Sequence, residues 1–508
     1  LVRFRGRGNR CPRQMAQGRE DDGNAPPGTG CTEDVTPASP AIVWFRNDLR
    51  VGDNPALVAA IESGRPIACL YVFDEVTPGR WRMGGASRWW LHHSLLRLAA
   101  SLERLGAPLI LRRGIAHDVV PRLVSEFDAA AVYWNRQYEA FAVAQDTRIK
   151  MRLGAMGVEA HSFNGSLLHE PWTVKTKTGE PYRVFTPFWR ACAQLGLARS
   201  PLPSPKRIAP FAHAGGENLT QWRLLPTKPN WAVGFEPEWT PGEAGAHAAL
   251  IRFLEGPAAT YANDRDQLGI HGTSRLSPHL HFGEISPVQI WAAAHNAPRA
   301  EKFLSEVGWR EFAHHLLFHW PNLPERNWRG SFDAFPWRTD ASGLAAWQRG
   351  QTGYPVVDAA MRELWTTGYM HNRARMIAAS FLIKHLLIDW RAGEDWFWDT
   401  LLDADLANNA ASWQWIAGCG ADAAPYFRIF NPVTQGERYD ANGVYVRRWI
   451  PEIAALPNNV LHQPWQADAE TLSTAGVRLG QTYPYPIVEH GVARQRALAA
   501  FSSLRSEI

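Results

Sequence analysis

The chain has 508 residues, of which 45% are hydrophobic and 20% are charged. This composition is typical of globular proteins and excludes a largely disordered or fibrous chain. The formal net charge is only +4, so any polyanion must bind a local basic patch rather than the whole surface.

Two further features narrow the class of protein. The longest apolar run, residues 376–390, is interrupted by Lys384 and His385 before it reaches the ~18 residues that a membrane span needs. The five cysteines lie far apart and form no CxxC pair, which argues against a disulfide framework and against a zinc ribbon. We therefore expect a cytoplasmic protein with no membrane partner and no metal.

Residues 1–40 are rich in Arg, Gly, Pro and Asp without apolar periodicity, and we interpret them as a disordered extension. From residue 41 short β-rich runs alternate with helical periods: AIVWF, PALVAAIES, PIACLYVF, SRWWLHHSLLRLAASL, PLILRR, DVVPRLVSEF, AAVYW, AVAQDTRIKMRLGAMG and VEAHSF. This alternation predicts an α/β domain, residues 41–168, with a doubly wound parallel sheet.

The remainder of the chain has a different character. Residues 169–240 contain many Pro, Gly, Lys and Trp with little periodicity, and we interpret them as a long linker. Residues 241–508 show helical periods only, which predicts an all-α domain. No GxGxxG follows the first strand, so the sequence gives little support to a nicotinamide dinucleotide site.

Three segments of the helical domain combine residues that are suited to a cofactor. Residues 273–277 (TSRLS in the motif GTSRLS) offer hydroxyls and backbone N–H groups at a helix start. Such groups suit a pyrophosphate, but they also suit an ordinary helix cap. Glu306, Trp309 and Arg310 share one helix face, which suits either a planar heterocycle or a solvated salt bridge. His315 and His319 lack the HExxH pattern and an acidic third ligand, so no metal site is predicted.

The third segment is MHNRARMIAASFL, in which a buried Arg375 would need an anionic partner. The stretch LDADLANNAASWQW can supply it. Read as a helix, this stretch places Asp405, Asn409 and Trp413 on one face and Trp415 on the neighbouring face.

These motifs, together with AIVWFRNDLRVGDNPAL, EVGWREF, GYPVVDAAMRELWTTGYMHNRARM and DAAPYFRIFNPVTQGERYD, resemble the DNA photolyase and cryptochrome family from residue 41 to about residue 500. The resemblance implies an α/β antenna domain, a long linker and a helical domain that binds FAD. It assigns to FAD the residues Tyr261, Thr273, Ser274, Arg275, Leu276, Ser277, Arg375, Asp403, Ala404, Asp405 and Asn409. Arg375 would pair with Asp403 beside the isoalloxazine ring, Asp405 would meet the ring or ribitol edge, and Asn409 would face the ring nitrogen.

Within the family, enzymes that repair the (6-4) photoproduct carry two histidines where this chain has Asn372 and Met376. The chain is instead similar to the class I cyclobutane pyrimidine dimer enzymes, which implies ultraviolet-damaged DNA as partner and light-driven splitting of a flipped-out dimer by electron transfer from reduced FAD. The implied lesion and DNA contacts are Arg265, Glu306, Trp309, Arg310, Asn372, Arg373, Met376 and Trp415.

The chain holds 24 tryptophans, and the resemblance gives three of them an electronic role. Trp413, Trp390 and Trp337 would carry electrons from the surface to oxidised FAD, whereas Trp347, Trp396 and Trp398 are interpreted as core packing. Folate-binding relatives carry Asn-Glu where this chain has Phe141 and Ala142, which argues against a folate as second chromophore. A deazaflavin, a flavin nucleotide or an empty antenna site stay open.

Two other functions remain open from the sequence. A photosensory cryptochrome would signal through a partner, but plant cryptochromes carry Asp at the position of Asn409, and Asn favours the reduced anionic flavin. A flavin-dependent dark oxidoreductase is disfavoured by the missing nicotinamide motif. We further expect a monomer that associates with the bacterial nucleoid when it binds DNA.

Overall fold

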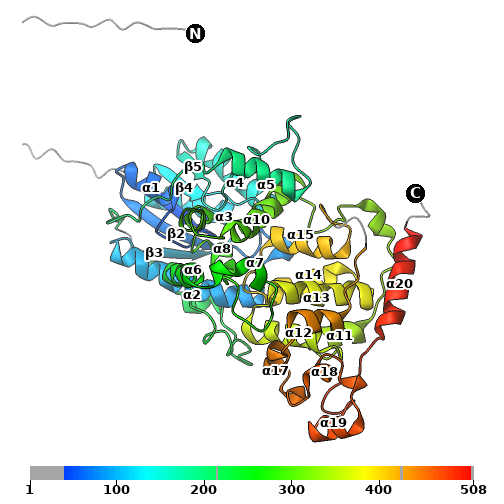
Figure 1. Cartoon of the computed structure of the whole chain (residues 1–508). Helices are drawn as coiled ribbons and strands as arrows, with labels where there is room; N and C mark the ends of the chain where they lie inside the picture. Colours follow the sequence, from blue (N-terminus) through cyan, green and yellow to red (C-terminus); the bar gives the residue numbers. More distant parts are fainter. Residues whose placement is uncertain (1–38, 213–214, 424–426, 505–508) are drawn as a thin grey trace, which may run out of the picture. The chain divides into compact units, whose positions relative to one another are not determined.

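The computed structural model describes residues 39–212, 215–423 and 427–504. The extension expected at residues 1–40 lies almost wholly outside these ranges. The described residues form a parallel sheet with helices on both faces, followed by a long segment and an all-helical part (Figure 1). The predicted fold class is therefore confirmed.

The sheet has five parallel strands in the order β3-β2-β1-β4-β5. The order reverses beside β1, which pairs with β2 on one side and with β4 on the other. Every residue of these three central strands is buried, because helices cover both faces. The strands are β1 (Ala41–Phe45), β2 (Ile67–Phe73), β3 (Leu109–Arg113), β4 (Ala131–Asn135) and β5 (Glu159–Phe163).

Side chains of β1 alternate between the two faces of the sheet, as a strand requires. Val43 and Phe45 belong to the core formed with α1 and α2, whereas Ile42 and Trp44 belong to the core formed with α3 and α4. The four helices are α1 (Pro55–Glu62), α2 (Gly85–Arg104), α3 (Ala116–Phe127) and α4 (Ala140–Ala155). All strands and helices that the alternation predicts in this part of the chain are present.

The segment expected to be an irregular linker contains a helix, α5 (Phe185–Leu195). Phe185, Phe188 and Cys192 form its buried face, at the i, i+3, i+7 spacing of a helix. Pro187 lies in the first turn, where proline is tolerated, and the surrounding Pro-rich sequence concealed the helical period. The expectation of irregular structure was therefore wrong for this stretch, whereas the assignment of residues 169–240 to a linker stays a prediction.

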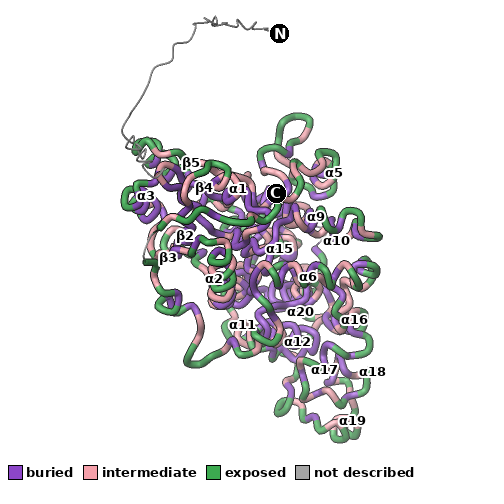
Figure 2. Tube along the Cα trace, turned by 90° about the vertical axis from the view of Figure 1, so that its left-hand side faces the viewer, coloured by how far each residue is buried: buried purple, intermediate pink, exposed green. Residues whose placement is uncertain are grey.

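The helical part is built around α15 (Leu406–Ala417), which packs against α10 (Glu301–His319), α13 (Asn372–Ser380) and α14 (Trp390–Thr400). Buried residues dominate α15 in Figure 2. The other helices are α6 (Glu243–Glu255), α7 (Tyr261–Asp264), α8 (Ser277–His281), α9 (Pro287–Ala294), α11 (Ala341–Gln348), α12 (Pro355–Thr367), α16 (Pro432–Tyr439), α17 (Val444–Trp449), α18 (Asn458–Leu461), α19 (Ala469–Thr474) and α20 (His490–Ser503).

Candidate functional site

A partly buried ion pair joins two of the segments that the sequence assigns to a cofactor. Arg375 on α13 donates through Nη2 to both carboxylate oxygens of Asp403, at 3.0 and 2.8 Å, and through Nε to the carbonyl of Met370 at 2.7 Å. Burial alone would lower the pKa of Arg375, but Asp403 outweighs it and raises the pKa. The predicted pairing is present, and the guanidinium stays charged inside the helical part.

The segment of residues 273–277 meets the same ion pair. The Ser277 hydroxyl donates to Asp403 at 2.5 Å, and Arg275 adopts a left-handed φ of 52°. The Arg275 side chain donates to Glu238 at 2.9 Å and lies over the ring of Trp239. Because the Arg275 and Ser277 side chains are already engaged, the backbone and the hydroxyls of Thr273 and Ser274 are the groups of the segment that remain suited to a pyrophosphate.

Asp405 has partners other than those expected for it. It caps α15, accepting from the backbone N–H of Asn408 at 2.8 Å, and its other oxygen lies 3.3 Å from Nε2 of His314 on α10. Burial acts to raise the pKa of Asp405, but His314 and His281 hold it well below its usual range. The Asp405 carboxylate therefore fixes the start of α15 and faces α10. Its contact with the ring or ribitol edge of the flavin stays a prediction.

Asn409 lies one helical turn after Asp405 and is buried. Its Nδ2 donates to the backbone carbonyl of Glu394 on α14 at 3.0 Å. This bond fixes the orientation of the Asn409 amide. Glu394 is fully buried, and its burial raises its pKa well above the ordinary value, which favours the neutral carboxyl.

Several buried polar atoms in this region have no protein partner in the described part of the chain. They include Nε2 of His371, Nε1 of Trp413 and both carboxyl oxygens of Glu394. The Nδ1 of His371 accepts from the N–H of Arg373, and burial lowers the pKa of His371 to about 4, so Nε2 carries a free proton. Unpaired buried donors beside a charged arginine fit an anionic dinucleotide such as FAD.

The predicted lesion and DNA residues form a partly exposed rim. Glu306 on α10 accepts from Nη1 of Arg265 and lies 2.8 Å from Nζ of Lys302. Arg373 on α13 lies 2.5 Å from Asp266. The sequence therefore identified three residues of the rim, Glu306, Arg265 and Arg373. It missed their charged partners Lys302 and Asp266.

The other predicted pocket residues surround this rim unevenly. Trp309 stacks on Phe185 of α5 with ring centroids 3.8 Å apart, and Nε1 of Trp415 donates to the Asp422 carbonyl at 3.0 Å. On α13, Asn372 is exposed and its Nδ2 lies 3.9 Å from the Met376 sulfur.

Arg310 differs from its prediction as a DNA contact. Its Nη1 donates to the Ser166 carbonyl at 2.8 Å and lies 3.3 Å from Glu311, which directs the guanidinium toward the segment after β5. The side chain is 12% exposed. The structure therefore gives no support to a DNA-facing role for Arg310, because its charge is used to join α10 to the α/β part.

The three tryptophans of the expected electron route lie in or against one hydrophobic core. Trp413 and Trp390 are buried, and Nε1 of Trp390 donates to Asn327 at 2.9 Å, whereas Trp337 is partly exposed. Trp413 also contacts Trp347, with ring centroids 6.3 Å apart. Burial therefore decreases toward Trp337, in the direction that a route to the surface requires.

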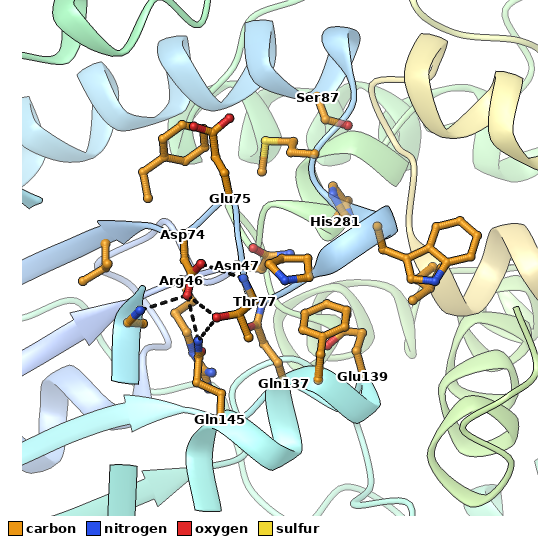
Figure 3. Close-up of a pocket in the computed structure, with 18 of the residues that line it drawn as sticks. Arg46, Asn47, Asp74, Glu75, Thr77, Ser87, Gln137, Glu139, Gln145 and His281 are labelled. Carbon is orange, nitrogen blue, oxygen red and sulfur yellow. Dashed lines mark hydrogen bonds between the residues drawn. The ribbon is translucent and has the colours of Figure 1, made fainter. Parts of the chain in front are cut away.

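A second pocket lies at the carboxyl ends of β1, β2 and β4, where the strand order reverses (Figure 3). Sheets of this type bind ligands at such a switch point. At its centre Asp74 accepts from Thr77 at 2.6 Å and from Gln145 at 2.9 Å. Burial acts to raise the pKa of Asp74, but the bond from the Thr77 hydroxyl and three backbone N–H groups lower it. Phe141, at one of the positions of the missing folate pair, lines the pocket.

Two kinds of feature are absent from the described residues. None of the helices within them is long and apolar enough to cross a membrane. Within the same ranges no group of three or more His, Cys, Asp or Glu side chains is arranged to hold a metal ion.

Comparisons with known proteins define the class. Residues 41–206 match the family model described as DNA photolyase, and residues 303–503 match the FAD binding domain of DNA photolyase. The chain belongs to the DNA photolyase and cryptochrome family.

Two curated relatives and one solved structure illustrate the range of similarity. A deoxyribodipyrimidine photo-lyase of Agrobacterium fabrum is 52% identical over 92% of this chain and 98% of its own length. Cryptochrome-1 of Arabidopsis thaliana is 40% identical over 91% of this chain and 70% of its own length. A crystal structure described as a bacterial class III photolyase from Agrobacterium tumefaciens is 52% identical, covers 92% of this chain and 98% of that chain, and superposes with a TM-score of 0.89. The narrower resemblance to class I enzymes receives no support from these similarities.

Proposed function

We propose that this chain is a deoxyribodipyrimidine photo-lyase, a lyase that uses light and FAD to split cyclobutane pyrimidine dimers in DNA. The observation that carries the proposal is the combination of the partly buried Arg375–Asp403 pair with a partly exposed rim that holds Glu306, Arg265 and Arg373. The 52% identity to a photo-lyase over nearly its full length supports repair over photosensory signalling. We also propose that the enzyme falls in class III rather than class I, in line with the similar crystal structure.

In this proposal the chain's own groups bind and orient. Arg375 and Asp403 would lie beside the flavin, the hydroxyls and amides of residues 273–277 would receive its pyrophosphate, and Asn409 would face the ring nitrogen. When bound and reduced, FAD supplies a light-excitable electron donor. The Glu306 carboxyl donates a hydrogen bond to the dimer carbonyl and stabilises the negative charge that develops there, and Trp309, Asn372, Met376 and Trp415 form the walls of the lesion pocket.

The DNA must present its dimer outside the helix, because a buried site cannot reach a stacked base. Base flipping is a known strategy of photolyases, and its cost is lowest at a damaged step. The arginines at the rim supply phosphate contacts that offset this cost. Trp413, Trp390 and Trp337 would conduct electrons to oxidised FAD, and the pocket at the sheet switch point would hold a second, antenna chromophore of a chemistry that the residues leave open.

Three organisational features complete the proposal. The boundaries are an extension at residues 1–40, an antenna domain at 41–168, a linker at 169–240 and a catalytic domain at 241–508. The protein acts as a monomer. It resides in the cytoplasm and associates with the nucleoid when bound to DNA.

The function is tested with purified, reduced protein and ultraviolet-irradiated oligothymidine. Recovery of thymine absorbance in blue light but not in darkness is the expected result. A protein that binds FAD and leaves the dimers intact under illumination would instead favour the photosensory cryptochrome.

A further inference from the structure

Five side chains at the rim form a continuous row of alternating charges, which we term the charge ladder: Lys302, Glu306, Arg265, Asp266 and Arg373. Nζ of Lys302 lies 2.8 Å from Glu306, and Glu306 accepts from Nη1 of Arg265. Nε of Arg265 lies 4.0 Å from Asp266, and Asp266 lies 2.5 Å from Nη2 of Arg373. The ladder joins α10, the end of α7 and α13 across the rim.

The two arginines of the ladder are held more firmly than ordinary surface cations. Their side chains are 15% and 16% exposed, whereas those of Glu306 and Asp266 are 26% and 29% exposed. The Arg265 guanidinium lies over the ring of Tyr261 and that of Arg373 over the ring of Tyr439, at 5.7 and 4.5 Å from the ring centroids. Both arginines are therefore positioned, and each already has a carboxylate as partner.

This arrangement limits what a DNA phosphate can gain at the rim. With three cations and two carboxylates, the ladder carries one net positive charge. A phosphate that approaches Arg373 or Arg265 must compete with a carboxylate already in contact, and it also meets the negative charge of Asp266. Undamaged DNA places no base against Glu306, so the contact between Glu306 and Arg265 stays intact. We call this state the closed ladder.

We propose that Asp266 is a specificity residue, which suppresses binding of undamaged DNA and is relieved when a lesion draws Glu306 away from Arg265. The inference rests on the proposed function, since it requires Glu306 to contact the dimer. Once Glu306 turns to the lesion, Arg265 has Asp266 as its remaining carboxylate neighbour and can also bind a phosphate. Asp266 thus opposes phosphate binding while the ladder is closed. In the lesion complex it still repels the phosphate, but it offsets part of this repulsion because it stabilises the Arg265 guanidinium that the phosphate contacts.

The test is Asp266→Asn in the full-length, FAD-bound protein, measured in darkness with two duplexes that differ only in one thymine dimer. We expect the affinity for the undamaged duplex to rise about fivefold to tenfold, because one opposing charge near a phosphate is removed. The slope of log affinity against log salt for that duplex should steepen by about 0.9, the value for one added phosphate contact. The affinity for the dimer duplex should change by less than about twofold, since the two effects of Asp266 offset each other there.

The matched control is Glu301→Gln, which removes the same charge from the exposed first turn of α10, outside the ladder. It should alter neither the ratio of affinities nor the salt slope. Asp266→Ser serves as a second variant and should repeat the result if the asparagine variant folds poorly.

The outcomes separate the two proposals. Equal gains on both duplexes, or no gain on either, would overturn the role of Asp266, because the ladder would then be an ordinary set of surface ion pairs. A wild-type protein that shows no preference for the dimer duplex would overturn the proposed function itself, and the inference with it.

Discussion

The ion pair between His314 and Asp405 makes a prediction that can be worked out from its geometry. Nε2 of His314 lies 3.3 Å from Asp405, and its Nδ1 lies 3.0 Å from the Arg310 carbonyl. At this separation the Coulomb attraction is about 5 kcal/mol for an effective dielectric constant of about 20. Removing one partner of a buried pair typically costs about 3–5 kcal/mol.

We therefore predict that His314→Gln lowers the free energy of unfolding by about 2–3 kcal/mol. The loss stays below that of a fully orphaned charge, because Asp405 keeps the bonds from the Asn408 N–H and from Asn408 Nδ2. Since Asp405 caps the helix that carries Asn409, the variant should also retain less FAD.

The pH dependence of this loss follows from the two pKa shifts. Burial opposes protonation of His314, but Asp405 outweighs it and raises the pKa above 6.5. The stability contributed by His314 is therefore complete below pH 6.5 and is lost as the pH rises through the raised pKa. The pKa of Asp405 is lowered, so its contribution is present above 3.8 and is lost as the pH falls through the lowered value. The difference between wild type and variant should thus be greatest between 3.8 and 6.5.

Urea unfolding followed by tryptophan fluorescence measures this difference at about pH 5.5 and at about pH 9.5. The bound FAD fraction, measured by flavin absorbance, provides a second readout. His314→Gln should lower the unfolding midpoint clearly at the acidic pH and much less at the basic pH. An equal loss at both would refute the charged pair and leave only the packing of the histidine ring.

Three further predictions concern the proposed reaction. Glu306→Ala should slow dimer splitting about tenfold at unchanged flavin content, because it removes one hydrogen bond to a developing charge; an unchanged quantum yield would refute this role. Trp337→Phe should block photoreduction of oxidised FAD but spare repair by protein reduced beforehand, and photoreduction at the wild-type rate would indicate another electron route. Arg375→Gln should leave Asp403 as an unpaired buried charge and lower the free energy of unfolding by about 3–5 kcal/mol, measured by urea unfolding; a loss under about 1 kcal/mol would mean that Asp403 is solvated.

The sequence was sufficient for the fold because each element carried a local signal. The five strands are short apolar runs bounded by turns, and every helix between them has a helical period. Helix α5 was missed because Pro187 and the Pro-rich surroundings suggest a loop, while its helical face is stabilised by long-range contacts such as Phe185 on Trp309. A period of three buried residues over 11 was the signal that could have identified it.

The site shows the opposite limit. Arg375 and Asp403 could be paired from the sequence, because a buried arginine demands an anion and the resemblance supplies one. The partners of Asp405 and Arg310 could not be predicted from the sequence. Helix periodicity indicates which face a residue occupies, but it does not indicate which distant segment of the chain packs against that face. His314, 91 positions before Asp405, and Ser166, 144 positions before Arg310, are brought there only by the packing of α10 between the two parts of the fold.

The same reasoning explains why Asp266 escaped notice at the rim. Next to Arg265 in a polar segment, it has the appearance of an ordinary surface acid, and only the approach of α13 places Arg373 against it. A sequence search for DNA contacts selects cations and passes over the carboxylates between them. If the charge ladder controls discrimination, those carboxylates determine how much of the positive charge undamaged DNA can use, and specificity then depends on residues that a count of arginines leaves out.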